Sequence, residues 1–222
     1  MNHIELTNDI LSKAIKLPTD IYGLKWLPSF DTQPSFIGND QDWIIGPDPL
    51  PPAHFTPLDH QALEYALSKL TSPPKLIVEI GVDECGGISS TNTLLRTKST
   101  DCMYVGMDIK DKSYLNNIEN NIFTIRGDSA NYTELYKMMD WYGHEQIDFM
   151  FVDGWHSINQ VIKEWKYWER MAPNAVMAFH DTNYHPGPVA LFDAIDTDIF
   201  SVELFGRGIS DWGVGVVQRL KV

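Results

Sequence analysis

The most constraining feature of this sequence is a series of short apolar runs in which hydrophobic and polar residues do not alternate. A run of this kind is typical of a strand that is buried on both faces, as in a parallel sheet. Strands that alternate with helices predict a doubly wound α/β fold with a mostly parallel sheet. The runs occupy residues 75–81, 103–108, 122–128, 147–153 and 175–181.

The stretches before and between these runs have the spacing of apolar residues that is typical of helices. Before the first strand, apolar residues recur at i, i+3, i+4 and i+7 and so share one helical face. Helices are expected at residues 58–70, 158–171 and 189–195.

Two further apolar runs close the chain, at residues 200–205 and 213–219. The segment between them is too short for a helix, so these strands are expected to pair antiparallel. The sequence therefore predicts a seven-stranded, mostly parallel sheet that ends in an antiparallel β-hairpin.

The first 56 residues differ from the rest in being dense in proline and in large aromatics such as Trp26, Phe30, Phe36 and Trp43. Proline disfavours long helices and central strands, whereas the aromatics need burial. We expect residues 1–56 to form an irregular arm with one short helix at about residues 7–16. The arm is expected to act as a lid or an oligomer contact, or simply to cover a helix on the far face.

Composition narrows the classes of partner. The chain has 30 acidic and 17 basic residues, a net charge of −13, which disfavours nucleic acid held by bulk electrostatics. No apolar run is long enough for a membrane span, and two cysteines fit a reducing cytosol. We expect a cytoplasmic protein that acts on a small molecule. The sequence is compatible with a homodimer.

Acidic residues mark the ends of the predicted parallel strands. Ligands of such sheets bind beyond the carboxyl ends of the strands, where acids would crowd unless a ligand or cation balanced them. We expect at least Glu79, Asp108 and Asp153 to converge on one cavity. The acids are Glu79, Asp108, Asp128, Asp153 and Asp181.

The loop at residues 81–87 is rich in glycine, which lets a cofactor approach the backbone closely. Glu79 precedes the first glycine, where an acid suits an ammonium group better than a pyrophosphate. Asp108 stands where an acid hydrogen-bonds a ribose diol. A ligand that carries both a cation and a ribose suggests S-adenosylmethionine.

These motifs resemble those of class I S-adenosylmethionine-dependent methyltransferases, which have a Rossmann-like sheet. The resemblance includes Glu79-Ile80-Gly81, Asp108, Gly127-Asp128-Ser129 and Asp153-Gly154-Trp155-His156, and it extends over roughly residues 57–220. Residues 147–182 are similar to the branch that contains the catechol-O-methyltransferase-like and macrocin-type sugar O-methyltransferases. The resemblance implies an S-adenosylmethionine-binding domain over residues 57–222 and transfer of a methyl group to a sugar or phenol oxygen.

The resemblance also implies cofactor contacts. Glu79 and Gly81 would contact the methionine moiety and Asp108 the ribose, while Asp128 and Ser129 would lie by the adenine. The full set of expected cofactor-binding residues is Glu79, Gly81, Gly87, Ser89, Asp108, Asp128, Ser129, Asp153 and Trp155.

In metal-dependent members of this family, acids at the ends of the fourth and fifth strands hold a divalent cation. The matching residues here are Asp153, His180 and Asp181, which leaves open a divalent cation such as Mg²⁺ or Mn²⁺. An imidazole at position 180 shifts the preference away from Mg²⁺. His156 is expected to be the catalytic base, with Asp153 and Asp181 as further catalytic residues.

Less specific interpretations also remain at this stage. His156 could stand beside a helix cap, His180 could be a packed core residue and Asp181 could form an Asx turn. Trp165 and Trp168 are expected in the core or an interface. At the level of function, the alternatives are a nicotinamide-dependent oxidoreductase on the same kind of sheet and a catalytically degenerate S-adenosylmethionine-binding module.

Overall fold

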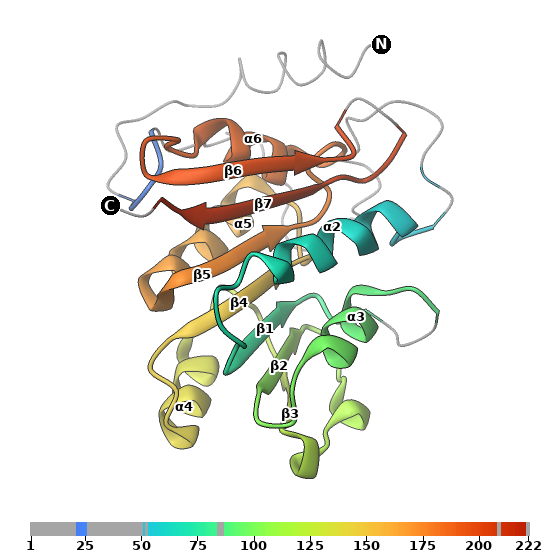
Figure 1. The fold of residues 1–222 in the computed structure, drawn as a ribbon, viewed down its shortest axis with the longest axis vertical. Coiled ribbons are helices and arrows are strands. Elements are labelled where there is room, and N and C mark those ends of the chain that lie inside the picture. Colours follow the sequence, from blue (N-terminus) through green and yellow to red (C-terminus); the bar gives the residue numbers. More distant parts are fainter. Residues whose placement is uncertain (1–20, 26–50, 52, 84–86, 208–209, 221–222) are drawn as a thin grey trace.

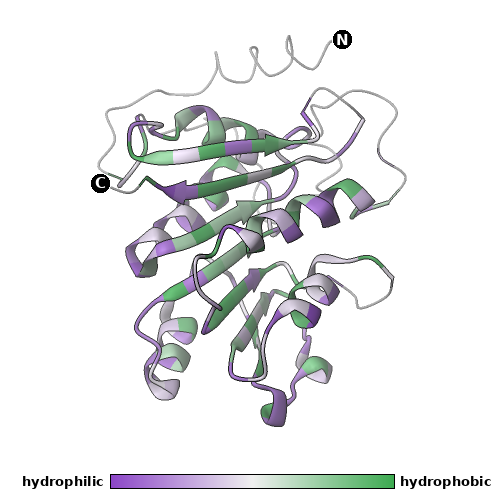
Figure 2. Ribbon diagram, viewed as in Figure 1, coloured by the Kyte–Doolittle hydropathy of each residue, from purple (hydrophilic) through white to green (hydrophobic). Residues whose placement is uncertain are grey.

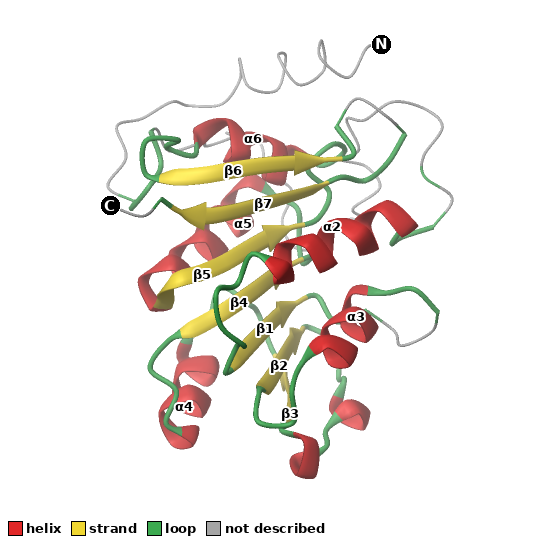
Figure 3. Ribbon diagram, in the orientation of Figure 1, coloured by secondary structure: helices red, strands yellow, loops and turns green. Residues whose placement is uncertain are grey.

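A computed structural model of the protein describes residues 21–25, 51, 53–83, 87–207 and 210–220. It contains a seven-stranded sheet in the order β3-β2-β1-β4-β5-β7-β6 (Figures 1 and 3). All neighbouring pairs are parallel except those that β7 makes with β5 and β6. The strands are β1 (Leu76–Ile80), β2 (Met103–Asp108), β3 (Ile122–Arg126), β4 (Ile147–Val152), β5 (Met171–Phe179), β6 (Phe200–Phe205) and β7 (Val214–Arg219).

Helices cover both faces of the sheet. One face packs against α2 (Pro57–Ser68) and α3 (Ser90–Thr97). The other packs against α4 (Thr133–Tyr142), α5 (Ile158–Trp165) and α6 (Pro186–Ala194). Figure 2 shows the apolar colouring concentrated on the strands. The predicted doubly wound sheet with its closing antiparallel hairpin is therefore confirmed.

The two helix layers explain the apolar runs, because side chains alternate between the faces of a strand. In β1 the side chains of Leu76 and Val78 join the core under α4 to α6, and Ile77 joins the core under α2 and α3. Glu79 has the same parity as Ile77, so its carboxyl group enters the α2–α3 layer.

The helix expected at residues 158–171 is shorter than predicted. The α-helix ends at Trp165 and continues as a 3₁₀ helix over Lys166–Arg170, and β5 then begins at Met171. In a 3₁₀ turn, residues three apart project on the same side. Trp165 and Trp168 both lie in the core at 0% and 1% exposure, which confirms the expected structural role for these two residues.

Only part of the N-terminal 56 residues is described. The short helix predicted at residues 7–16 and the four large aromatics of the arm lie outside the described residues. Within residues 21–25, Leu24 bridges to Ile195 and the Tyr22 carbonyl accepts a hydrogen bond from Trp165 Nε1 at 2.9 Å. This piece of the arm therefore packs on the α5–α6 side of the sheet, while the role of the arm as a whole stays a prediction.

Two further observations concern the described part of the chain. None of its helices combines the length and the apolar character needed to cross a bilayer. Cys102 is a buried free thiol whose pKa is raised by burial to about 11, and Cys85 lies outside the described residues.

Candidate active site

The carboxyl ends of β2, β1 and β4 lie side by side and bring Asp108 and Asp153 to the two flanks of β1. The amide of Val82 donates to Asp108 Oδ2 at 3.1 Å, and the amide of Asp153 donates to the Ile80 carbonyl at 2.8 Å. Gly81 follows β1 with φ of +79°, and a Cβ at this position would lie 1.9 Å from the Asp153 carbonyl oxygen. The sequence requires glycine here because the neighbouring strand end passes so close.

Glu79 lies behind this edge rather than on it. Its side chain is fully buried, and Oε2 accepts hydrogen bonds from the hydroxyls of Thr91 and Tyr104. Burial raises the pKa of Glu79 to about 7. Its predicted contact with the methionine moiety stays a prediction.

Asp108 organises the loop that follows β1. Besides the Val82 amide, its carboxylate accepts a hydrogen bond from the Lys110 amide at 2.7 Å, and Lys112 Nζ lies 4.0 Å away. The Asp108 side chain is 13% exposed, so it reaches the surface of the crevice. An acid fixed at the end of β2 can accept hydrogen bonds from a diol.

The predicted contacts at the start of α3 are partly described. Gly87 has φ of +72° and open space around it, and residues 84–86 of the loop lie outside the described residues. Ser89 is the N-cap of α3, where its hydroxyl accepts from the Asn92 amide at 3.2 Å. Trp155 is half-buried beyond the end of β4. The roles of these three residues toward a cofactor stay predictions.

Four of the predicted catalytic and metal-binding residues form one compact cluster at the ends of β4 and β5. His156 Nε2 lies 2.9 Å from Asp181 Oδ2 and 3.4 Å from Asp153 Oδ1. His180 Nδ1 lies 3.2 Å from Asp181 Oδ2 and 3.3 Å from Asp153 Oδ1. Two imidazoles and two carboxylates thus surround one small volume. The Asp153 side chain is 20% exposed, so the cluster has contact with solvent there.

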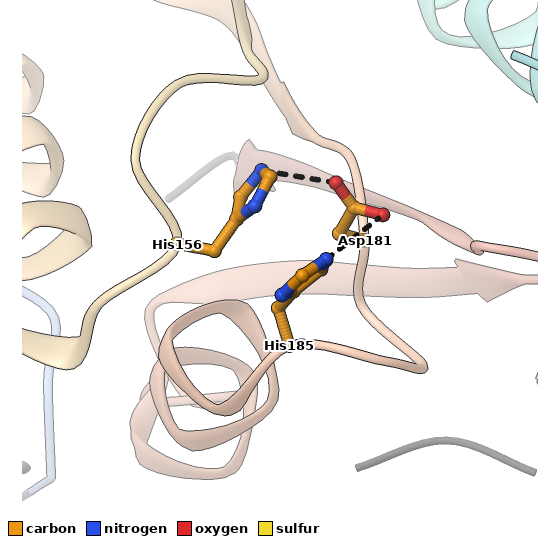
Figure 4. A group of neighbouring side chains, drawn as sticks. All are labelled: His156, Asp181 and His185. Carbon is orange, nitrogen blue, oxygen red and sulfur yellow. Dashed lines mark ion pairs between the residues drawn. The ribbon is translucent and has the colours of Figure 1, made fainter. Parts of the chain in front are cut away.

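Asp181 owes its central position to an unusual backbone. Its φ of +61° is a left-handed conformation that residues other than glycine rarely adopt. The carboxylate that results lies between His156 and a third imidazole, His185, whose Nε2 is 3.9 Å from Asp181 Oδ1 (Figure 4). The rings of His156 and His185 lie 4.3 Å apart, at 31° to each other. His185 was not among the predicted site residues, although its proximity in sequence hinted at it.

A second unpredicted residue approaches from α2. Asp59 is 1% exposed, and its Oδ2 lies 3.2 Å from His180 Nε2 on the side away from Asp181. The same oxygen accepts the Thr56 amide at 2.8 Å in the capping box of α2. The Phe55 ring packs against the His180 ring at 5.5 Å. No local pattern in the sequence links α2 with the end of β5, so only the tertiary structure reveals this contact.

Two opposing effects set the pKa values in the cluster: burial disfavours the charged forms, and nearby opposite charges favour them. Burial disfavours a charged His156, but Asp181 and Asp153 outweigh it and raise the pKa of His156 to about 10. Burial likewise opposes ionisation of Asp181, yet His180 and His156 hold its pKa well below the usual range. His185 behaves oppositely, because burial and the charge of His156 lower its pKa to about 4. These shifts favour the protonated forms of His156 and His180 and the neutral form of His185.

The donor set suits a divalent cation. One atom each from Asp153, His180 and Asp181 lies within 4.8 Å of the others, and His156, Asp181 and His185 form a second such group. Mixed imidazole and carboxylate ligands favour Mn²⁺, Fe²⁺ or Zn²⁺ over Mg²⁺. The protons that the histidines hold in this state are those that a bound cation would displace.

The third strand contributes at the opposite flank of the crevice. Asp128 follows β3 and is exposed, with Oδ1 accepting from the Ala130 amide at 2.8 Å. Ser129 is 8% exposed and donates its hydroxyl hydrogen to Glu164. A separate cavity of about 460 Å³ lies at the amino-terminal ends of β1, β4 and β5, beside Lys75, His144 and Asp148. None of the predicted site residues lines it.

The chain is similar in sequence to a known protein family. A methyltransferase-domain family model matches residues 78–182, a range that extends from within β1 to just beyond β5 and includes Asp153, His156, His180 and Asp181. Residues 78–182 are therefore similar to a methyltransferase domain. No curated protein sequence matches the chain.

Solved structures of methyltransferases share this fold. MycE from the mycinamycin biosynthetic pathway, in complex with Mg, SAH and mycinamycin VI, is 15% identical with a TM-score of 0.54 over 75% of this chain. The match covers 50% of MycE, so the chain spans about half the length of that protein. CalS11, a TDP-rhamnose 3'-O-methyltransferase, is 13% identical with a TM-score of 0.53 and coverages of 74% and 79%. An O-methyltransferase from Bacillus cereus in complex with SAH is 17% identical, with a TM-score of 0.50 and coverages of 77% and 84%.

The family resemblance drawn from the sequence is thus confirmed, and the oxidoreductase alternative loses its support. The structure brings together Asp153, His156, His180 and Asp181, the set that the family resemblance implied. Their chemical roles, like those of the expected cofactor contacts, stay predictions.

Proposed function

We propose that this methyltransferase transfers a methyl group from S-adenosylmethionine to an oxygen of a small hydroxylated acceptor, a sugar or a phenol. The observation that carries the proposal is the cluster of Asp153, His156, His180 and Asp181 beside the Gly81 turn. It places a basic group and a cation-binding set next to the strand ends where class I folds bind their cofactor.

On this proposal the cofactor lies along the ends of β1, β2 and β3. S-adenosylmethionine supplies the methyl group and the thioether leaving group. Asp108 would accept hydrogen bonds from the ribose, and Asp128 and Ser129 would face the adenine. Aligning the acceptor oxygen with the methyl group is a proximity effect, to which the rigid strand ends contribute.

The second requirement is removal of the acceptor proton. As the new oxygen–carbon bond forms and the sulfur–carbon bond breaks, the hydroxyl proton would pass to Nε2 of His156. Asp153 and Asp181 orient that nitrogen and stabilise the imidazolium. Because these two acids raise the pKa of His156 to about 10, His156 can serve as a base only when their charge is balanced.

Asp153, His180 and Asp181 would hold the balancing cation. A divalent cation in this position supplies Lewis acidity that lowers the pKa of an acceptor hydroxyl. MycE has been crystallised with Mg, and the imidazole in the present set argues for Mn²⁺ as the better occupant here.

The relatives support an oxygen acceptor. CalS11 is a TDP-rhamnose 3'-O-methyltransferase, and MycE binds mycinamycin VI. TDP-rhamnose carries a sugar, which belongs to the acceptor class proposed for this chain.

The test is production of S-adenosylhomocysteine from S-adenosylmethionine with a panel of sugar nucleotides, glycosides and catechols, with Mn²⁺, with Mg²⁺ and with EDTA. We expect turnover with Mn²⁺ on at least one hydroxylated acceptor, loss with EDTA, and at least about a hundredfold loss in His156→Gln. Cofactor binding without turnover of any acceptor would instead favour the degenerate binding module, and failure to bind S-adenosylhomocysteine would reject the proposal.

A further inference from the structure

A buried polar network lies directly behind Asp128, on α5. Gln160 Nε2 lies 3.1 Å from Asp128 Oδ1, 2.9 Å from Ser129 Oγ and 3.1 Å from Glu164 Oε1. The Ser129 hydroxyl donates to Glu164, and the Tyr167 hydroxyl donates to the Ser129 carbonyl at 2.7 Å. One amide group therefore connects an exposed acid to two residues in the interior.

The burial of this network is costly. Gln160 is 3% exposed and Glu164 is 0% exposed. Burial raises the pKa of Glu164 to about 7, and its Oε2 is buried with no hydrogen-bond partner among the described residues. Leaving a buried polar atom unpaired costs about 1–3 kcal/mol, so a carboxyl group at this position needs a reason beyond packing.

The position of Glu164 supplies a reason. A Cβ built on Gly154, just beyond β4, would lie 3.3 Å from Glu164 Oε1. The carboxyl group thus lies beneath the end of β4, while its partner Ser129 follows β3. The network spans the floor of the crevice between these strand ends, where the adenine is expected.

The network also leaves one specific group free for a ligand. Asp128 Oδ1 is held by the Ala130 amide and by Gln160, whereas no donor within the described part of the chain reaches Oδ2. A carboxylate oxygen with a fixed direction accepts a hydrogen bond from an amino group and repels a carbonyl oxygen. Adenine presents an amino group at its six position, and hypoxanthine presents a carbonyl.

We propose that Gln160 and Glu164 are positioning residues that hold the Asp128 carboxylate for recognition of the adenine amino group. The inference rests on the proposed function, since it deepens how the same cofactor is recognised. Neither residue touches the reacting atoms. Their effect is therefore expected on the choice of base and not on the chemical step.

The experiment measures the dissociation constants of S-adenosylhomocysteine and S-inosylhomocysteine by calorimetry for the wild-type protein and for Gln160→Met. Methionine has a similar size and no donor, so it removes the hydrogen bonds with little change of volume. The matched control is Lys163→Met, an exposed residue on the same helix. Glu164→Met, which removes the acceptor for Gln160 and Ser129, is the second variant if Gln160→Met does not fold.

We expect wild-type protein and Lys163→Met to prefer the adenine ligand by about tenfold or more, the size of one charge-assisted hydrogen bond. In Gln160→Met or Glu164→Met this preference should fall at least about threefold, through weaker binding of the adenine ligand alone. Equal weakening of both ligands, or an unchanged preference, would overturn the inference and leave the proposed function intact. If the wild-type protein binds neither ligand, the proposed function itself fails.

Discussion

Glu79 is a fully buried acid whose carboxyl group accepts hydrogen bonds from neighbouring hydroxyls. Thr91 and Tyr104 donate to one carboxyl oxygen, but the group has no solvent contact. Its pKa of about 7 exceeds the value of 4.5 expected for an unfolded chain. The folded state therefore binds a proton that the unfolded state has released between these two pH values.

This difference predicts a pH-dependent loss of stability. The stabilisation is complete below pH 4.5 and is lost as the pH rises to about 7. We expect Glu79→Gln, which cannot ionise, to gain about 3 kcal/mol in unfolding free energy relative to wild-type protein over this range. Urea unfolding at a series of pH values, without ligand, measures the change. Glu119→Gln, at an exposed position, is the control, and parallel pH profiles for Glu79→Gln and wild-type protein would contradict the prediction.

Asp59 is a second buried acid, and it contacts the imidazole of His180. It faces His180 Nε2, which leaves Nδ1 directed at Asp153 and Asp181. Carboxylates that orient a ligating imidazole in this way typically contribute 10–100-fold, roughly, to metal affinity.

We expect Asp59→Asn to weaken Mn²⁺ binding by about 10–100-fold, measured by calorimetry or by electron paramagnetic resonance. Asparagine can still accept the Thr56 amide, so the capping box of α2 should persist. Glu64→Gln removes an exposed carboxylate from the same helix and should bind Mn²⁺ as the wild-type protein does. Equal affinity in Asp59→Asn and Glu64→Gln would show that Asp59 has no part in holding the cation.

At the scale of elements, the site depends on how closely α6 approaches the start of α5. The Gly187 amide donates to the His156 carbonyl at 3.0 Å. A Cβ on Gly187 would lie 2.3 Å from that carbonyl oxygen and 2.7 Å from the Ser157 carbonyl oxygen. The missing side chain lets the two helix ends meet and thereby fixes the backbone that carries His156.

Gly187→Ala should therefore separate these helix ends. We expect a loss of about 1–3 kcal/mol in unfolding free energy, together with a fall in turnover of about tenfold or more because His156 moves from its place. Denaturant unfolding and steady-state rates are the two measurements. Gly127→Ala adds a methyl group to open space and should leave stability unchanged. A Gly187→Ala protein with wild-type stability would contradict the proposed packing.

The elements themselves differ in how well the sequence predicts them. Runs such as residues 147–153 are strands as expected, because apolar character without alternation has few other solutions in a chain of this kind. The break after Trp165 was not predicted, because an amphipathic pattern continues through residues 158–171 whether the turns are α or 3₁₀. Residues three apart lie on one face in both kinds of helix, so the burial of Trp165 and Trp168 is compatible with either.

At the scale of the whole molecule, the sequence by itself determined the doubly wound sheet and the common edge at which Asp108, Asp153 and Asp181 lie, and the family resemblance implied that His156 and His180 lie there too. The reason is that parallel strands end at one edge, so residues at their tips meet whatever the intervening lengths. Only the tertiary structure decided that Asp59 faces His180, that His185 joins Asp181, and that Gln160 and Glu164 lie behind Asp128. These contacts join separate layers of the fold, and their geometry depends on helix packing, which leaves no periodic signal in the chain.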